Sequence, residues 1–272
     1  MTAAIAELIR LLDLERVEDN LFRGLSPATE VQRIFGGQVL AQALVAAART
    51  VSPDRHCHSL HAYFVRPGDP KVPVIYQVDP ARDGGSFSVR RVAAVQHGKQ
   101  IFVLAASFQK DETGFEHQAG MPAVPPPEAL ADAGDATRIW WAARPFEFRP
   151  VTPRGLGDRP ARAPLDHIWF RVPPPLAGDA ILHQAFLAFA SDMSLLDTSL
   201  LPHGKGIFSD LQVASLDHAM WFHRPFRIDD WLLYSQESPS ASGARGFSRG
   251  QIFTRDGTLI ASVAQEGLIR PR

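Results

Sequence analysis

The chain has 272 residues, and its hydrophobic content of 45% is that of an ordinary globular protein. Its 28 basic and 29 acidic residues nearly cancel and leave a formal net charge of −1, so the chain as a whole does not attract nucleic acid or an anionic membrane. The one cysteine, Cys57, excludes an intrachain disulfide and a zinc site built from several cysteines, as is typical of a reducing compartment.

The first segment, MTAAIAELIRLLDLERVEDN, predicts an amphipathic helix, because charged residues recur among its apolar ones at helical spacing. A signal peptide needs an unbroken apolar run instead. No apolar run in the sequence approaches the roughly 18 residues of a membrane span. The chain ends in IRPR, which differs from a peroxisomal SKL signal. We therefore expect a cytoplasmic protein, and the many arginines and few lysines suggest a GC-rich bacterial genome.

Two parts of the chain share one pattern, an apolar helix followed by β-rich runs. The helices are predicted over GGQVLAQALVAAART, residues 36–50, and ILHQAFLAFASDMSLL, residues 181–196. Both are apolar on nearly all sides, which indicates burial. An Arg-Pro dipeptide follows each helix, and the spacing from its proline to a hairpin glycine is 31 residues to Gly98 in one half and 32 to Gly257 in the other. The two halves therefore predict two copies of one unit.

A segment rich in proline and alanine, with the sequence MPAVPPPEALADAG, lies between the halves and predicts a linker. We divide the chain into an N-terminal unit (1–118), a linker (119–143) and a C-terminal unit (144–272). A long buried helix wrapped by a curved antiparallel sheet is the hotdog arrangement. Two such units in one chain predict a double hotdog of the α+β class.

The segment GFSRG, residues 246–250, fits the G-x-S-x-G pattern of serine hydrolases. A nucleophile elbow needs a long helix after the serine. Here QIFTRDGTLIASVAQEGLI follows instead, which is two β-rich runs joined at Asp256-Gly257, a dipeptide typical of tight hairpin turns. We therefore expect Ser248 to lie inside a strand, and a serine esterase is the weakest of the function hypotheses.

Several motifs together resemble those of one family: LFRGLSP, IFGGQVLAQAL, HSLHAYFVRPGDP, RDGGSFSVRRVAA, GFEHQ, LDHAMWFHRPF, ARGFSRG and VAQEGLIR. From about Leu14 to Arg270, the sequence resembles the acyl-CoA thioesterase II family, the TesB type. The resemblance implies a double hotdog that hydrolyses fatty acyl-CoA to free fatty acid and CoA without a cofactor, as a homodimer or homotetramer. The family does not require serine in the middle of ARGF-x-RG, which further weakens Ser248 as a nucleophile.

The resemblance also implies that an aspartate, a hydroxyl residue and a glutamine in the second half are catalytic. These are Asp192 in FASDMSLL, Ser215 in VASLDHAMWF and Gln265 in VAQEG. The hydroxyl residue is commonly threonine in the family and is serine here. An unpaired carboxylate among the apolar residues of the second helix would be costly, so Asp192 needs polar partners, and the other two can supply them. We expect the carboxylate to accept a proton from a positioned water, with no acyl-enzyme.

Three further residues are candidates for substrate binding. His58 is a candidate secondary or substrate-positioning group. Gly36 and Gly37, at the start of the first apolar helix, are placed either to present backbone N–H groups to a thioester oxygen or to allow close packing. His218, three residues after Ser215, is a candidate to support the catalytic residues.

The histidines around Cys57 do not predict a metal site. His56, His58 and His61 cannot all converge on one ion with it, because residues 58 and 61 of a strand point to opposite faces. We expect no metal.

Two other functions fit a hotdog fold. A hydratase or dehydratase acting on acyl-CoA would use an Asp/His pair, and the set Asp192, Ser215 and Gln265 contains no histidine. A non-catalytic acyl-CoA-binding sensor would carry a regulatory module, and no segment of the sequence predicts one. Release of free thiol from an acyl-CoA distinguishes a thioesterase from both.

Overall fold

The computed structural model describes residues 2–27, 32–130, 145–153, 155, 157–173 and 175–272. The strands of this part of the chain are β1 (Glu15–Glu18), β2 (Leu21–Gly24), β3 (Arg55–Phe64), β4 (Val74–Asp83), β5 (Phe87–Gln96), β6 (Lys99–Lys110), β7 (Glu147–Pro150), β8 (Leu165–Arg171), β9 (Leu211–Ser215), β10 (Asp217–Phe222), β11 (Leu232–Ser242), β12 (Arg245–Thr254) and β13 (Leu259–Pro271). The helices are α1 (Ala3–Leu12), α2 (Gly36–Ala48) and α4 (Ala180–Ser191), with two 3₁₀ segments, η1 (Pro127–Ala129) and η2 (Leu196–His203).

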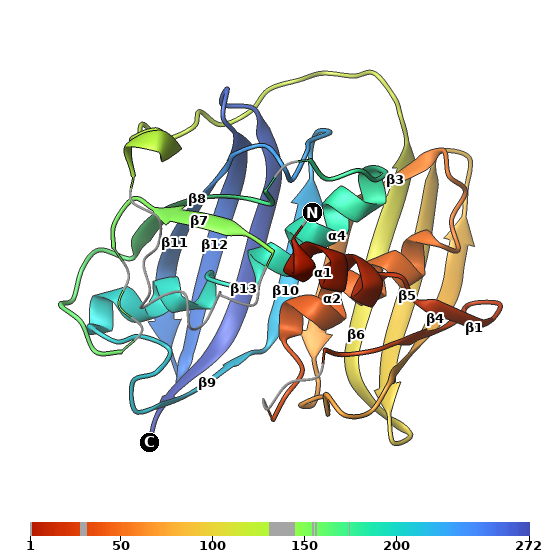
Figure 1. The fold of residues 1–272 in the computed structure, drawn as a ribbon, viewed down its shortest axis with the longest axis horizontal. Helices are drawn as coiled ribbons and strands as arrows, with labels where there is room; N and C mark the ends of the chain where they lie inside the picture. Colours follow the sequence, from red (N-terminus) through yellow and green to blue (C-terminus); the bar gives the residue numbers. More distant parts are fainter. Residues whose placement is uncertain (1, 28–31, 131–144, 154, 156, 174) are drawn as a thin grey trace.

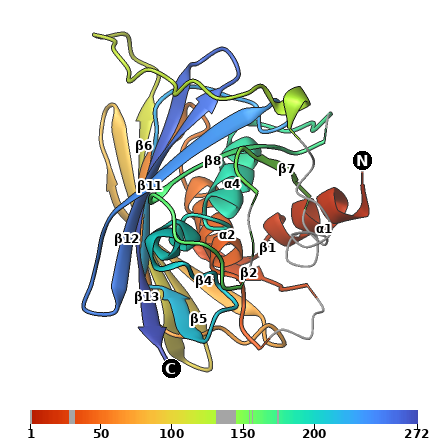
Figure 2. The same cartoon turned by 90° about the vertical axis from the view of Figure 1, so that its left-hand side faces the viewer.

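The strands form one sheet of thirteen, in the order β1-β2-β4-β5-β6-β3-β10-β13-β12-β11-β8-β7, with β9 paired to β13. The first half of the chain supplies one side of the sheet and the second half supplies the other. The two sides join where β3 pairs with β10, with Leu60 opposite Met220. In Figure 2 the sheet lies along one side of the molecule and α2 and α4 lie on the other. This arrangement confirms the predicted double hotdog.

The two central helices are buried along nearly their whole length, as their sequences predict. Alanine and leucine dominate both helices and favour helical structure. A Cβ added at Gly37 would lie 2.5 Å from the backbone oxygen of Phe189, so glycine allows α2 and α4 to approach closely. The two helices lie side by side in both Figure 1 and Figure 2. Most of the buried apolar side chains belong to one cluster around them.

The amino-terminal helix is amphipathic, as predicted. The side-chain oxygen of Thr2 caps α1 by accepting a hydrogen bond from Ile5 N. The helix buries Ile5, Leu8, Leu11 and Leu12 and packs against α2. Its charged residues face away from the core.

Both predicted hairpin glycines lie in turns. Gly98 joins β5 to β6 with φ +70°, and Gly257 joins β12 to β13 with φ +90°. These positive φ values are ones that side chains with a Cβ rarely adopt. Ser248 lies inside β12, with a second strand and no helix after it, so the strand expected there is confirmed.

Residues 131–143 of the predicted linker (119–143) lie outside the described residues. The described part of the linker packs on the second half of the chain. Trp169 Nε1 donates a hydrogen bond to Pro125 O at 2.9 Å. Met121, Val124 and Leu130 pack against a small apolar cluster that includes Trp169.

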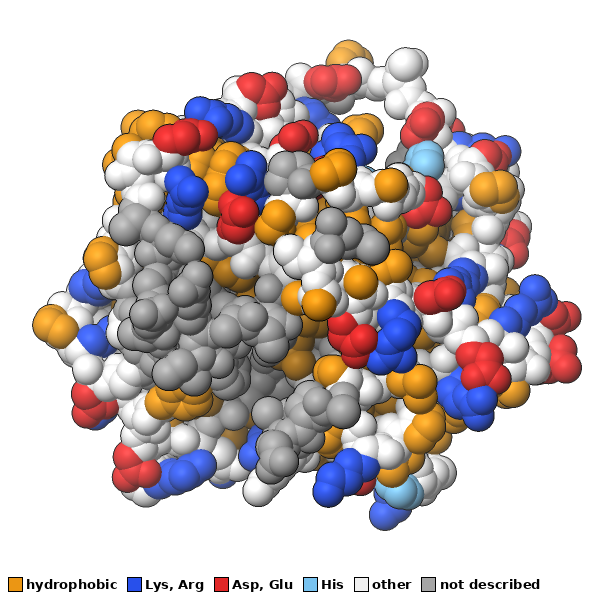
Figure 3. Space-filling model, in the orientation of Figure 1, with side chains coloured by type: hydrophobic (Ala, Val, Ile, Leu, Met, Phe, Trp, Pro, Cys, Tyr) orange, Lys and Arg blue, Asp and Glu red, His pale blue; other side chains and the backbone are white. Residues whose placement is uncertain are grey.

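Charged side chains are interspersed on the face shown in Figure 3, with basic and acidic residues next to each other. This agrees with the near-zero net charge. Within the described ranges, no helix is both long and apolar enough to cross a lipid bilayer.

Candidate active site

Asp192, Ser215 and Gln265 form a closed triangle of hydrogen bonds, which we call the carboxylate triangle. Gln265 Nε2 lies 2.7 Å from Asp192 Oδ1 and 2.7 Å from Ser215 Oγ. The Ser215 hydroxyl donates to the same carboxylate oxygen at 3.3 Å. The structure thus brings together three residues that the sequence separates by up to 73 positions.

Each member of the triangle comes from a different element. Asp192 is the C-cap of α4, whereas the sequence predicted a helix that continued through residue 196. The α-helix ends at Ser191, where an aspartate, a weaker helix former than alanine or leucine, follows, and the chain goes on into the 3₁₀ segment η2. Ser215 ends β9, where it pairs with Gly267. Gln265 lies in β13, an interior strand of the sheet.

Two members of the triangle are withdrawn from solvent, and the third, Ser215, is half-buried. The side chain of Asp192 is 3% exposed and Gln265 is fully buried. Burying a carboxylate is costly unless hydrogen bonds compensate, and two donors contact Oδ1 here. A carboxylate held in this way has the lone pairs of its other oxygen with which to accept a proton.

The other carboxylate oxygen faces the start of α2. A Cβ added at Gly36 would lie 2.7 Å from Asp192 Oδ2 and 2.9 Å from the ring of Phe64. Glycine therefore allows the backbone of α2 to approach Oδ2 closely. The first N–H groups of a helix have no partner within the helix, and this end carries the positive part of the helix dipole. The site thus combines a carboxylate with a place that favours negative charge.

His218 lies behind the triangle and is fully buried. Its Nε2 is 2.9 Å from the hydroxyl of Ser191, and its Nδ1 is 3.9 Å from Asp192 Oδ1. Burial lowers the pKa of His218 to about 3, while its interaction with Gln265 acts weakly in the opposite direction. The imidazole is therefore neutral at physiological pH. Ser191 was not singled out in the sequence, although a polar residue directly before Asp192 in an apolar helix is a usable signal.

The remaining candidates lie in different places. Gly36 is at the triangle, whereas Gly37 is where the two central helices touch. His58 accepts or donates a hydrogen bond with Ser107 Oγ at 2.8 Å, and its ring packs edge-on against Phe87. Both partners of His58 belong to the first half of the chain, and burial lowers its pKa. Among the described residues, it makes no hydrogen bond to the triangle.

Ser248 lacks the surroundings of a nucleophile. It is fully buried, and its backbone lies opposite Gln265 in the pairing of β12 with β13. Its hydroxyl has no hydrogen-bond partner in the part of the chain that the structure describes, so no histidine or carboxylate there activates it.

No metal site is formed by the residues that the structure describes: no group of three or more His, Cys, Asp or Glu side chains among them could hold an ion. Cys57 is buried and donates to the backbone oxygen of Ser59, and burial raises the pKa of its thiol well above the usual range.

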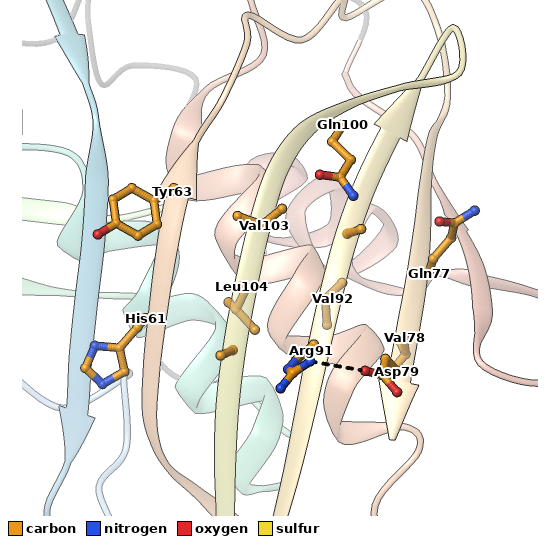
Figure 4. Close-up of a pocket in the computed structure, with 12 residues that line it drawn as sticks. His61, Tyr63, Gln77, Val78, Asp79, Arg91, Val92, Gln100, Val103 and Leu104 are labelled. Carbon is orange, nitrogen blue, oxygen red and sulfur yellow. Dashed lines mark ion pairs between the residues drawn. The ribbon is translucent and has the colours of Figure 1, made fainter. Parts of the chain in front are cut away.

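A shallow apolar depression of about 530 Å³ lies away from the triangle, on the sheet of the first half (Figure 4). It is lined by residues of β3 to β6, and the ion pair of Arg91 with Asp79 lies at one end of it. His61, Tyr63 and Arg91 are exposed side chains of the outer face of the sheet. No member of the triangle lines this depression.

The chain matches two family models, "Acyl-CoA thioesterase N-terminal domain" over residues 25–109 and "Acyl-CoA thioesterase" over residues 143–268. It is 45% identical to human acyl-coenzyme A thioesterase 8 over 280 residues, which cover 96% of this chain and 88% of that protein. It is 41% identical to acyl-CoA thioesterase 2 of Haemophilus influenzae over 283 residues, which cover 99% of each chain. Among solved structures, the acyl-CoA thioesterase II TesB2 of Mycobacterium marinum superimposes with a TM-score of 0.84 at 46% identity, covering 97% of this chain and 98% of that one. The chain therefore belongs to the acyl-CoA thioesterase II family of the TesB type and is a thioester hydrolase.

Proposed function

We propose that this protein hydrolyses fatty acyl-CoA to free fatty acid and CoA by direct attack of a water molecule that Asp192 activates. The observation that carries this proposal is the carboxylate triangle, in which Ser215 and Gln265 hold a buried carboxylate beside the amino end of α2. The thioesterase relatives support the choice of substrate.

The two carboxylate oxygens have different roles in this proposal. Oδ1 accepts the hydrogen bonds of Ser215 and Gln265, which fix the plane of the carboxylate. Oδ2 faces Gly36, and we assign the hydrolytic water to this side. The hydroxyl of Ser215 is close enough to Asp192 to contact the same water. All three residues thereby determine where the water sits.

The reaction then needs no covalent intermediate with the enzyme. As the water oxygen bonds to the thioester carbon, its proton passes to Asp192 and the carbonyl oxygen becomes an oxyanion. We assign the stabilisation of that oxyanion to backbone N–H groups of the first turn of α2, which begins at Gly36 beside Asp192. When the C–S bond breaks, Asp192 returns the proton to the leaving thiolate. The products are the fatty acid and CoA, and the enzyme is regenerated.

A hydratase or dehydratase is less well supported. Such an enzyme needs a histidine and a carboxylate that both face the substrate. His218 is the histidine near Asp192, but it is fully buried and its Nε2 is engaged by Ser191. It lies behind the carboxylate, not beside Gly36.

The test is a panel of acyl-CoA substrates from short to long, with detection of free thiol and of the remaining thioester. We expect one thiol for each thioester consumed, and the panel also gives the preferred chain length. An enoyl-CoA added to the panel separates the alternatives: its conversion to a hydroxyacyl-CoA that keeps the thioester, with no thiol released from any acyl-CoA, would contradict thioester hydrolysis and indicate a hydratase. Tight acyl-CoA binding without turnover at any chain length would indicate a binding protein.

We also propose that residues 1–118 and 144–272 are two hotdog units joined by the linker 119–143, and that the chain works as a homodimer or homotetramer in the bacterial cytoplasm. The ranges of the two family models, 25–109 and 143–268, support the division. Light scattering on the purified protein measures the number of chains, and a mass of about 30 kDa would contradict an oligomer. Cell fractionation tests the location.

A further inference from the structure

Three polar residues lie side by side on the inner face of three neighbouring strands, and we call them the polar row. Ser248 in β12 pairs with Gln265 in β13. His218 in β10 lies on the other side of Gln265. The strand register shows this, since the next residues, Ala219 of β10 and Ala264 of β13, pair with each other. All three members of the row are fully buried.

Each member of the polar row has one polar atom without a hydrogen-bond partner among the described residues. These atoms are His218 Nδ1, Gln265 Oε1 and Ser248 Oγ. Buried polar atoms without partners are rare because each costs free energy. Three of them in adjacent positions indicate an interaction that connects the row.

The amide of Gln265 must point in one direction for the carboxylate triangle to form. Its Nε2 carries two hydrogens, and the two short contacts to Asp192 Oδ1 and Ser215 Oγ use both. An amide rotated by half a turn would place Oε1 against the carboxylate and lose both bonds. Whatever holds Oε1 therefore keeps the triangle intact.

His218 can hold Oε1 only if its proton is on Nδ1. Nδ1 lies 3.9 Å from Asp192 Oδ1. The negative carboxylate attracts a proton on Nδ1 and repels a lone pair there. The Ser191 hydroxyl lies 2.9 Å from both Nε2 and the backbone oxygen of Ala188, and with this tautomer it can turn its one proton to Nε2. The environment of Nδ1 thus selects the tautomer that donates towards Gln265.

On the basis of the function proposed above, we propose that His218 is a positioning residue for thioester hydrolysis. Its Nδ1–H points at Oε1 of Gln265 and keeps the amide nitrogen on Asp192 and Ser215. A neutral imidazole is required, because a charged imidazolium would form an ion pair with Asp192 and compete with Gln265 for the carboxylate. The interaction with Gln265 that raises the pKa of His218, against the larger effect of burial, agrees with an accepting oxygen on that side. His218 touches neither substrate nor water in this arrangement.

The test is a double-mutant cycle, with free-thiol release from a saturating acyl-CoA as the readout. Replacing His218 by leucine should lower kcat by about tenfold or more, the effect of losing one oriented hydrogen bond, with KM within about twofold of the parent. In a protein that already carries Gln265→Ala, the same replacement should change kcat by less than about twofold. If His218→Leu lowers kcat by the same factor in both backgrounds, the proposal is wrong, because His218 then acts through something other than Gln265.

Two conservative variants keep the test decisive if His218→Leu does not fold. An asparagine at 218 places an N–H near the position of Nδ1, and a glutamine places one near Nε2. We expect His218→Asn to retain a higher kcat than His218→Gln, at equal or lower thermal stability. The opposite order would overturn the proposal.

Two other outcomes separate this inference from the proposed function. If Ser248→Ala lowers kcat tenfold and His218→Leu does not, Gln265 is held from the side of β12 and His218 is not the positioning residue. If Gln265→Ala itself has the kcat of the parent, the amide does not position the reaction and this inference fails, whereas the proposed mechanism fails only if Asp192→Asn also has the kcat of the parent.

Discussion

The two halves of the molecule have the same architecture but place opposite charges at the end of the central helix. The C-cap of α2 is Arg49, whose guanidinium donates to the backbone oxygen of Leu14 and to Asp13 at 2.7 Å. The C-cap of α4 is Asp192, which accepts from the other members of the carboxylate triangle. The first arrangement fastens α2 to the amino-terminal segment. The second holds a carboxylate beside the start of α2.

The difference continues on the inner face of the sheet. In the first half, Leu60 of β3 and Arg90 of β5 lie on either side of Ala106 of β6. These positions on three neighbouring strands correspond to those of the polar row in the second half. Arg90 is fully paired: it donates to the side chain and backbone of Thr50 and to both carboxylate oxygens of Asp83. The fold thus offers two equivalent places. The side chains of the first half fill theirs with a structural ion pair, and those of the second half hold the carboxylate that we propose as the base. Function follows from the site and not from the fold.

The largest effect should come from removing the carboxylate. Asp192→Asn keeps the shape of the side chain but cannot accept a proton from water, so kcat should fall by about 10²–10⁴-fold with little change in substrate affinity. The matched control is Arg49→Gln at the equivalent position of the first half, which should keep kcat within about threefold of the parent. Thiol-release kinetics on both purified proteins make the comparison. Equal losses in the two variants would show that the helix end matters for structure alone.

Smaller losses should follow removal of the two hydrogen-bond donors. Gln265→Ala should lower kcat more than Ser215→Ala, because the amide makes two bonds in the triangle and the hydroxyl donates one, each worth about 0.5–1.5 kcal/mol and more to a charge. The double mutant Asp192→Asn with Gln265→Ala should be far less than additive. Steady-state kinetics on the single and double variants test this, and full additivity would mean that the two residues act independently.

In the first half, the equivalent change should affect stability instead of activity. Arg90→Leu removes the donors that pair with Thr50 and Asp83, and the half-buried backbone oxygen of Thr50 loses the guanidinium as its donor. The free energy of unfolding should fall by about 1–3 kcal/mol, with kcat of the folded protein within about twofold of the parent. Denaturant unfolding and thiol-release assays measure the two quantities. A large fall in kcat without loss of stability would mean that the first half takes part in catalysis.

Acid should destabilise the second half more than the first through His218, whose counterpart in the first half is the apolar Leu60. The pKa of His218 falls from 6.5 to about 3 on folding, so the unfolded chain binds a proton more readily. Its contribution to stability is complete above pH 6.5 and is lost as the pH falls towards 3, by about 1.4 kcal/mol per pH unit. His218→Asn should therefore flatten the loss of stability between pH 6.5 and pH 4. Identical pH profiles for parent and variant, from denaturant titrations, would contradict this.

The smallest effect is expected at Ser248, in spite of its G-x-S-x-G context. Ser248→Ala removes a buried hydroxyl without a hydrogen-bond partner among the described residues, so kcat should stay within about threefold of the parent and stability should not fall. A fluorophosphonate probe should leave the protein unlabelled. Labelling of Ser248 by the probe, together with a hundredfold loss in Ser248→Ala, would contradict direct attack by water.

Much of the fold could be predicted from local patterns. The apolar helices, the glycine turns at Gly98 and Gly257 and the strand around Ser248 all depend on neighbours in the sequence. The three catalytic candidates came from family resemblance, and no spacing rule would have joined Asp192 to Gln265. Their contact depends on where α4 ends and on the register of β9 and β10 against β13, which only tertiary packing sets. Ser191 was missed for the same reason, because its partner His218 lies on another strand.

The most direct test of the mechanism follows oxygen atoms in water enriched in ¹⁸O, with enzyme in excess so that each site turns over once. If water attacks the thioester while Asp192 serves as the base, the fatty acid released in this first turnover carries one ¹⁸O atom and the protein carries none. If Asp192 attacks as a nucleophile and water then cleaves the resulting anhydride at the side chain, the first fatty acid is unlabelled and the ¹⁸O remains in Asp192. Mass spectrometry of the fatty acid and of the peptide containing Asp192 distinguishes the two results, and an unlabelled first product would contradict direct attack by water.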